Sequence, residues 1–192
     1  MDNVSHSVAL TQRLIRCPSV TPADAGALDV LAAELVSLGF ECTRLAFGEG
    51  DARIDNLFAW LGDKNASGPY AKHFCFAGHT DVVPAGDADA WQFDPFSGTL
   101  ADGNIYGRGA SDMKGGIAAF VGAVARLLES GSFDKAKGHA ISLMITGDEE
   151  GDAVNGTVKM VEWVQEHDLV PNLCVVGEPT NPDVVGDVIK NG

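Results

Sequence analysis

The 192-residue sequence has few basic residues, with 13 Lys and Arg against 27 Asp and Glu and a formal net charge of −14. Nucleic acids and anionic membranes are bound by clustered Lys and Arg, so this shortage argues against both as partners. No apolar run approaches the roughly 20 residues that cross a bilayer. Residues 1–6 lack the basic and apolar regions of a secretory signal. We therefore expect a soluble protein of the cytoplasm.

Cysteine is also scarce. The four cysteines are far apart and form no C-x-x-C pair; they are Cys17, Cys42, Cys75 and Cys174. The last three lie in apolar, strand-like runs, so we expect buried free thiols in a reducing compartment and no disulfide framework.

Hydrophobic residues make up 45% of the chain and aromatic residues 7%, which is typical of a globular protein with a packed core. Apolar periodicity predicts four helices, over about 4–16, 24–38, 113–128 and 157–166. Short apolar runs predict strands over 40–45, 56–61, 73–79, 104–106, 141–146 and 173–176. Residues 87–102 are predicted to form a loop. Strands that alternate with helices indicate an α/β, three-layer sandwich with a largely parallel central sheet and helices on both faces.

Polar residues follow four of the predicted strands. They are His79 and Asp81, then Asp112, then Glu149 and Glu150, and finally Glu178. Open α/β sheets form their ligand crevice at the carboxyl ends of the strands, so we expect these side chains to gather there. One imidazole with several carboxylates is a ligand set that suits zinc, and less specifically cobalt or manganese.

Each of these segments also has a plainer interpretation. Taken alone, Asp112 is better explained as the N-cap of the following helix. His79 alone is as well explained as a core histidine, although the two-residue spacing places Asp81 where its carboxylate can orient a metal-bound imidazole. The adjacent Glu149 and Glu150 cannot point the same way along a regular element, which favours one as a metal ligand and the other as a proton carrier. The combination of segments favours a metal centre.

A nucleotide site is the competing interpretation of Gly107-x-Gly109-x-x-Asp112, which resembles a dinucleotide fingerprint between a strand and a helix. Asp112 replaces the third glycine and would lie beside a pyrophosphate, so we reject this interpretation. The remaining histidines lack a comparable context and are predicted to be structural or surface residues; they are His6, His73, His139 and His167.

Five strings together resemble the zinc aminoacylase/carboxypeptidase-type metallopeptidase family. They are G-H-T-D-V-V-P (78–84), W-x-x-D-P-F (91–96), D-G-x-x-Y-G-R-G-x-x-D-M-K-G-G (102–116), T-G-D-E-E-G (146–151) and G-E-P-T (177–180). Residues 17–22 and 149–157 are most similar to the bacterial branch that removes succinate from N-succinyl-LL-diaminopimelate. A related deacylase, such as one acting on acetylornithine, or a dipeptidase is the alternative.

The resemblance implies roles for the residues at the strand ends. Asp112 would bridge two zinc ions and would be followed by a cis peptide bond. His79 and Glu178 would complete the first metal site, and Glu150 would bind the second metal. Cobalt is an alternative to zinc.

Two further residues receive catalytic roles from the same resemblance. Asp81 would orient His79. Glu149 would act as the general base that activates water for attack on the amide of a small-molecule substrate.

The resemblance covers only about the first half of a family member. A last histidine ligand for the second metal, and a lid domain through which family members form homodimers, would follow further downstream. We therefore expect residues 1–180 to be the N-terminal part of a catalytic domain and 181–192 the start of the connection to the lid. Alone, the chain should bind one metal well and a second poorly and show little turnover, and a non-catalytic metal-binding fragment is the alternative of another class.

Overall fold

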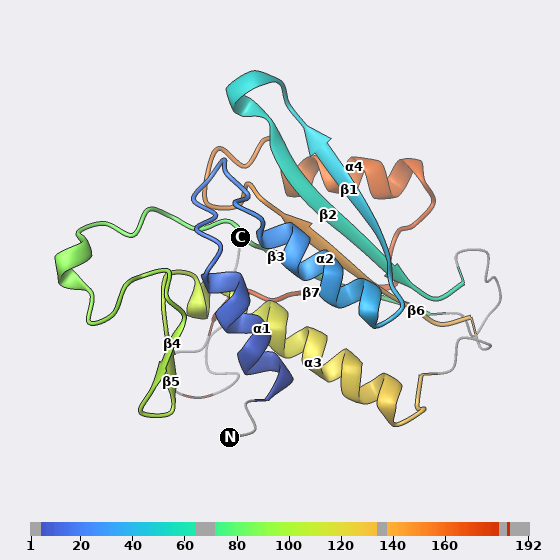
Figure 1. Ribbon diagram of the computed structural model, residues 1–192. Coiled ribbons are helices and arrows are strands. Elements are labelled where there is room, and N and C mark those ends of the chain that lie inside the picture. The colour runs from blue at the N-terminus through green and yellow to red at the C-terminus, as the bar shows by residue number, and fades with distance from the viewer. Residues whose placement is uncertain (1–4, 64–71, 134–137, 181–183, 185–192) are drawn as a thin grey trace.

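The computed structural model describes residues 5–63, 72–133, 138–180 and 184 (Figure 1). The helices are α1 (His6–Ile15), α2 (Ala27–Ser37), α3 (Gly115–Glu129) and α4 (Thr157–Glu166). The strands are β1 (Glu41–Phe47), β2 (Ile54–Leu61), β3 (His73–His79), β4 (Thr99–Ala101), β5 (Asn104–Tyr106), β6 (Ala140–Thr146) and β7 (Leu173–Val176). The predicted helices and strands are thus present with small shifts of their ends. The connection to a lid domain expected over residues 181–192 lies outside the described residues, of which only Val184 belongs to that stretch.

The central sheet has the strand order β1-β2-β6-β3-β7. β2 is antiparallel to both of its neighbours, whereas β3 is parallel to β6 and to β7. It follows that β1, β6, β3 and β7 all run in one direction and only β2 runs in the other. The prediction of a largely parallel sheet is confirmed. The antiparallel β1–β2 hairpin at one edge was not foreseen.

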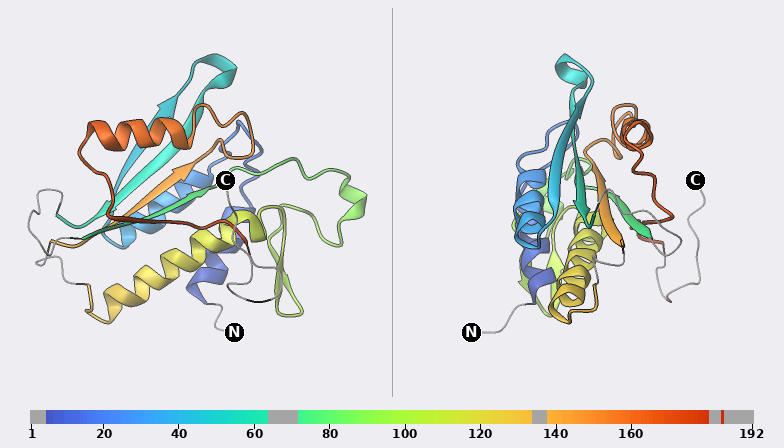
Figure 2. Two further views of the ribbon diagram at one scale, coloured as in Figure 1. Left: turned by 180° about the vertical axis from the view of Figure 1, so that it is seen from behind. Right: turned by 90° about the vertical axis from the view of Figure 1, so that its right-hand side faces the viewer.

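Helices cover both faces of this sheet (Figure 2). The first three helices lie on one face, where α2 buries Leu28, Leu31 and Leu35 at helical spacing. These side chains join one apolar cluster with Leu57, Ile117, Val121, Leu143 and Ile145. The fourth helix covers the other face, where Met160 and Val164 pack against Phe58, Trp60 and Met144. The expected three-layer sandwich is therefore present, and its two cores hold the central strands in place.

Two expectations about the chain were wrong. Residues 87–102 are not entirely a loop, because β4 pairs with β5 in an antiparallel hairpin. Cys174 is exposed, since every residue of the edge strand β7 is exposed. Cys75, in the neighbouring strand, is buried as expected, and Cys42 is half-buried. All four cysteines are free thiols.

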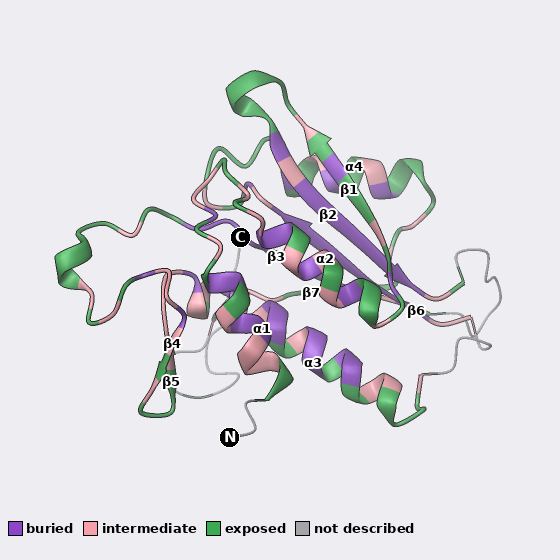
Figure 3. Cartoon of the chain, viewed as in Figure 1, coloured by how far each residue is buried: buried purple, intermediate pink, exposed green. Residues whose placement is uncertain are grey.

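Burial along the chain follows the layers (Figure 3). β6 is buried at every position, and β2 at all but one. Each helix has both buried and exposed residues. Among the described residues, no helix is both long enough and apolar enough to cross a membrane.

Leu143, in the centre of β6, provides a test of this core. Its side chain is fully buried in the cluster under the first three helices. We expect Leu143→Ala to lower the free energy of unfolding by about 2–5 kcal/mol, because the lost contacts leave a cavity in a packed core. Urea unfolding followed by circular dichroism measures the change.

Val158→Ala is the matched control, since Val158 on α4 is 57% exposed. Its effect should stay within about 0.5 kcal/mol. Equal effects of the two substitutions would contradict the described packing.

Candidate metal centre

The carboxyl ends of β3, β6 and β7 lie side by side and carry most of the predicted site. His79 is the last residue of β3 and is paired with Thr146, the last residue of β6. The backbone N–H of Gly177, which follows β7, donates to the carbonyl of Ala77 in β3. Because neighbouring parallel strands end at one edge, His79 meets the loop that carries Glu149 and the segment that carries Glu178.

The buried imidazole of His79 lies at the centre of the site. Its Nε2 atom is 3.0 Å from Asp112 Oδ1, 3.4 Å from Glu178 Oε1 and 3.9 Å from Glu149 Oε2. Two sets of side chains have ligand atoms that all lie within 4.8 Å of one another: His79 with Asp112 and Glu178, and His79 with Glu149 and Glu150. The predicted residues are therefore brought together.

Asp112 reaches the site from an irregular turn that precedes α3. Gly109 enters this turn at a φ of 80°, and a Cβ atom there would be 2.6 Å from the Val82 side chain. Asp112 and Met113 have non-helical backbone angles, and the peptide bond between them is cis, as the resemblance implied. The helix begins at Gly115, not at the predicted Met113, and its N-terminus has no side-chain cap. Asp112 is thus not an N-cap.

Asp81 holds the loop that carries the two glutamates. Its buried carboxylate accepts hydrogen bonds from the backbone N–H groups of Glu149, at 3.1 Å, and Glu150, at 3.0 Å. It also accepts a hydrogen bond of 2.7 Å from the Thr21 hydroxyl. The imidazole Nδ1 of His79 is 2.9 Å from the backbone carbonyl of Asp81 but 3.5 Å from its carboxylate. The backbone carbonyl is therefore the nearer group to orient His79, and the carboxylate mainly fixes the glutamate loop.

This arrangement defines the hydrogen-bonding state of His79. A carbonyl only accepts, so Nδ1 carries a proton and Nε2 points at the acids. A lone pair on Nε2 would repel Asp112 and Glu178, and either a proton or a cation relieves that repulsion. Nitrogen and oxygen donors around one point suit zinc, so the residues fit a divalent metal ion.

Burial, hydrogen bonds and neighbouring charges also shift the pKa values of the site residues. Burial disfavours the imidazolium, but hydrogen bonds and charge from Asp81, with a further hydrogen bond to Asp112, outweigh burial and raise the pKa of His79 to about 9. Burial also opposes the ionised form of Asp81, yet the neighbouring imidazole of His79 and the hydrogen bonds from Thr21 and two backbone N–H groups lower its pKa. For Glu150, burial and the nearby carboxylates of Asp112 and Glu149 raise the pKa despite the opposing charge of His79.

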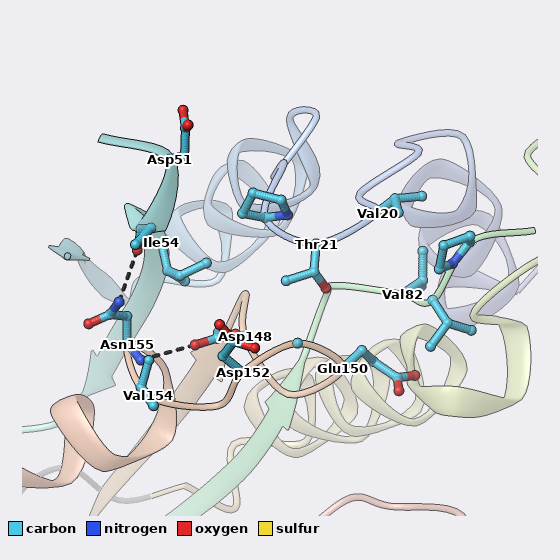
Figure 4. Close-up of a pocket in the computed structure, with 15 residues that line it drawn as sticks. Val20, Thr21, Asp51, Ile54, Val82, Asp148, Glu150, Asp152, Val154 and Asn155 are labelled. Carbon is cyan, nitrogen blue, oxygen red and sulfur yellow. Dashed lines mark hydrogen bonds between the residues drawn. The ribbon is translucent and has the colours of Figure 1, made fainter. Parts of the chain in front are cut away.

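A pocket of about 280 Å³ adjoins the cluster (Figure 4). Glu150 belongs to both the pocket wall and the second set of potential ligands. Thr21, Val82 and Asn155 also line it, and Asn155 is hydrogen-bonded to Asp148. Ligand pockets usually start at about 300 Å³, so this space suits part of a small molecule.

The remaining histidines stay outside the site. His6 is bound to Glu34, His73 to Ser142, and His167 to the carbonyl of Trp163. Among the described residues, His79 is the only imidazole in either set of potential ligands. In this part of the chain the second set therefore shares His79 with the first set and contains no second histidine.

Two residues near the site were not predicted. Thr21 bonds to Asp81, and Lys114 is completely buried with its Nζ 2.8 Å from the carbonyl of Cys17. Burial lowers the pKa of Lys114 to about 8. Nothing in the local sequence signals either contact, because each joins segments at least 60 residues apart.

Residues 75–190, more than half of the chain, match the family described as Peptidase family M20/M25/M40. The chain belongs to this family. A succinyl-diaminopimelate desuccinylase of Gluconacetobacter diazotrophicus is 61% identical over 97% of the chain and 46% of its own length. A protein of the same name from Rhodospirillum centenum is 59% identical over 96% of the chain and 46% of its own length. The chain spans about half the length of these curated relatives.

Solved structures of the family share the fold. Human carnosine dipeptidase 1 has a TM-score of 0.71 and 27% identity, over 88% of the chain and 37% of that structure. An M20 family metallo-carboxypeptidase of Sulfolobus solfataricus has a TM-score of 0.72 and 22% identity, over 94% of the chain and 38% of that structure. These similarities agree with the predicted α/β sandwich.

If His79 is a metal ligand, its raised pKa makes metal uptake depend on pH. A metal ligand must be deprotonated, so below a pKa of about 9 the ion would displace a proton from Nε2. We expect the apparent affinity for Zn²⁺ to rise about tenfold per pH unit between pH 6.5 and 8.5. Competition with a chromophoric chelator measures it, and calorimetry in two buffers of different ionisation enthalpy counts the released protons.

His6→Asn is the matched control, because His6 is an exposed histidine paired with Glu34 outside the site. Its profile should follow that of the unchanged chain. An affinity that is independent of pH between 7 and 8 would show that His79 is not the protonated ligand.

Proposed function

We propose that this chain supplies the metal-binding part of a desuccinylase. The reaction is hydrolysis of the amide bond of N-succinyl-LL-diaminopimelate to succinate and LL-diaminopimelate, a step of lysine and diaminopimelate biosynthesis. The observation that carries the proposal is the imidazole–carboxylate cluster in a chain 61% identical to a protein named for this activity. Because the chain spans 46% of that relative, the activity belongs to the longer protein.

In this proposal Asp112 is shared between two zinc ions. His79 and Glu178 bind the first ion, and Glu150 binds the second, with cobalt as an alternative metal. The first set of nearby ligand atoms, His79 with Asp112 and Glu178, supports the first site. The second set places Glu150 beside His79 and Glu149, and the sharing of Asp112 is taken from the family resemblance. When bound, zinc would supply Lewis-acid chemistry: it would polarise a substrate carbonyl and ease the ionisation of water.

Glu149 is proposed as the general base. Its side chain is 42% exposed, so it faces the space from which water and substrate arrive. Its backbone N–H is held by the Asp81 carboxylate, which limits how far its loop can move. From this position Glu149 takes a proton from the attacking water and returns it to the departing amine. Asp81 is proposed to support this step and to orient His79.

The alternatives within the family are a deacylase for acetylated substrates and a dipeptidase. The dipeptidase has a specific observation in its favour, the shared fold with human carnosine dipeptidase 1. That structure is only 27% identical to the chain, whereas the desuccinylase relatives reach 61%, so we favour the succinyl substrate. We further propose that the longer protein is a cytoplasmic homodimer, formed through a lid domain that follows the described residues.

The metal content of the chain tests the cluster itself. After dialysis against zinc-free buffer, elemental analysis should find about one zinc per chain. In the first set His79 lies beside two acids from different segments, Asp112 and Glu178, whereas both acids of the second set come from the glutamate loop. Asp112→Ala should lose this zinc, since Asp112 Oδ1 is 3.0 Å from His79 Nε2.

Glu129→Ala is the control, an exposed acid at the end of α3. It should retain the zinc. If the unchanged chain retained no zinc, it would not assemble the metal centre, and the hypothesis of a non-catalytic fragment would replace that of an enzyme.

A chimera tests the activity. Residues 1–180 would replace the corresponding part of the Gluconacetobacter relative, to which the chain is 61% identical. We expect the chimera to hydrolyse N-succinyl-LL-diaminopimelate faster than its N-acetyl analogue. Glu149→Gln should lower kcat by about 10²–10⁴ while zinc is retained, because it removes the proton carrier and not a ligand.

Glu129→Gln in the chimera is the matched control and should leave kcat unchanged. Faster turnover of the acetyl substrate would reject the succinyl specificity. Full activity of the Glu149→Gln chimera would reject Glu149 as the base.

A further inference from the structure

The segment 17–22 reaches the metal centre without contributing to either set of potential ligands. The Ser19 hydroxyl donates to the carbonyl of Thr80 at 2.6 Å, and the N–H of Val82 donates to the carbonyl of Ser19 at 2.9 Å. Val20 also pairs with Val82 in a parallel β-bridge. At the start of the segment, buried Lys114 donates to the carbonyl of Cys17. The segment is therefore fixed to the residues on both sides of Asp81.

These contacts bring Thr21 to Asp81. The Thr21 hydroxyl donates a hydrogen bond of 2.7 Å to Oδ2 of Asp81, the same oxygen that accepts the N–H of Glu150 at 3.0 Å. The N–H of Glu149 lies 3.1 and 3.2 Å from the two carboxylate oxygens. One carboxylate thus receives three donors from two segments that lie far apart in the sequence.

We propose that Thr21 is a positioning residue of the metal centre, whose hydroxyl holds the Asp81 carboxylate in the orientation that binds the Glu149 and Glu150 backbone. The inference rests on the proposed function in one respect, because it takes Glu150 as a metal ligand. Thr21 itself touches neither set of potential ligand atoms. Its effect passes through Asp81.

The buried position of Asp81 is the reason that the hydroxyl matters. The residue is only 2% exposed, so water does not readily replace a lost donor. A buried carboxylate that loses one of its hydrogen bonds loses stabilisation of its charge, which is costly where water does not restore it. The nearest alternative donor is His79 Nδ1, 3.5 Å from Oδ1. A rotation towards it would draw the carboxylate away from the two N–H groups that fix the glutamate loop.

The methyl group of Thr21 has a separate contact. A Cβ atom built at Gly151 would be 2.7 Å from Thr21 Cγ2, so this methyl lies directly against the residue after Glu150. Valine keeps this methyl and removes the hydroxyl, whereas serine keeps the hydroxyl and removes the methyl. The two substitutions therefore separate the hydrogen bond from packing.

The test is titration of the chain with Co²⁺ alone, followed by its visible absorption, for the unchanged protein, Thr21→Val and Thr21→Ser. We expect Thr21→Val to weaken Co²⁺ binding about tenfold or more and to alter the absorption band, as removal of outer-shell partners does at other metal sites. Thr21→Ser should restore binding to within about threefold of the unchanged chain.

Thr11→Val is the matched control. Thr11 is a buried threonine whose hydroxyl donates at 2.8 Å to the carbonyl of Ser7 within α1, away from the site. It should bind Co²⁺ like the unchanged chain. Unfolding midpoints of all variants report whether any change in binding comes from loss of the fold.

Two results would overturn the inference: Co²⁺ binding by Thr21→Val that equals that of the unchanged chain, or equal weakening by valine and serine. If the unchanged chain bound no Co²⁺, the proposed function would fail, and the positioning role would still be measured without metal. The amide proton shifts and exchange rates of Glu149 and Glu150 should then change in Thr21→Val and be restored in Thr21→Ser. Unchanged amides in the valine variant would reject Thr21 as a positioning residue.

Discussion

A single buried imidazole faces several carboxylates, and the rest of the structure serves to keep them together. His79 has Asp112 and Glu178 within 3.4 Å of Nε2, in a chain whose formal charge is already −14. Acids gathered this closely repel one another unless a positive charge lies between them. In the metal-free protein the imidazolium supplies that charge, since the pKa of His79 is raised to about 9. A divalent cation supplies more charge at the same point.

Packing of the sheet and the helices offsets the repulsion between these carboxylates. His79 and the glutamate loop lie at the ends of β3 and β6, whose side chains are buried in two apolar cores, so their backbones are held by packing that involves none of the acids. Asp81 adds a second means of restraint, because its carboxylate accepts backbone N–H groups from the glutamate loop. Lys114 compensates part of the buried negative charge near Asp81 and joins the segment 17–22 to the turn that carries Asp112. The site is thus built from rigid strand ends connected by a few buried polar contacts.

The sequence predicted every strand except β4, and the gathering of six polar residues beyond the strands, because both depend on local signals. A continuous apolar run followed by His79 or Glu178 is visible without knowledge of the fold. The sequence did not show that β2 runs antiparallel to its neighbours. An apolar run indicates a strand but does not specify whether that strand pairs in the parallel or the antiparallel direction. The exposure of Cys174 was missed for a similar reason, because the same kind of run forms central and edge strands. Thr21 and Lys114 were missed because their partners are distant in the sequence, and only the folded chain brings them together.

Glu149 and Glu150 show which features of the site can be predicted from the sequence and which require the structure. Their adjacency predicted different directions and hence different roles, yet both carboxylates lie within 4.8 Å of the His79 ligand atom, because the loop is irregular. Their surroundings distinguish them better than their directions do. Burial and neighbouring carboxylates raise the pKa of Glu150, so a cation beside it would relieve an existing repulsion. Glu149 is 42% exposed and is therefore accessible to water. These unequal surroundings around one imidazole support the proposal that the two adjacent, chemically identical side chains have different tasks.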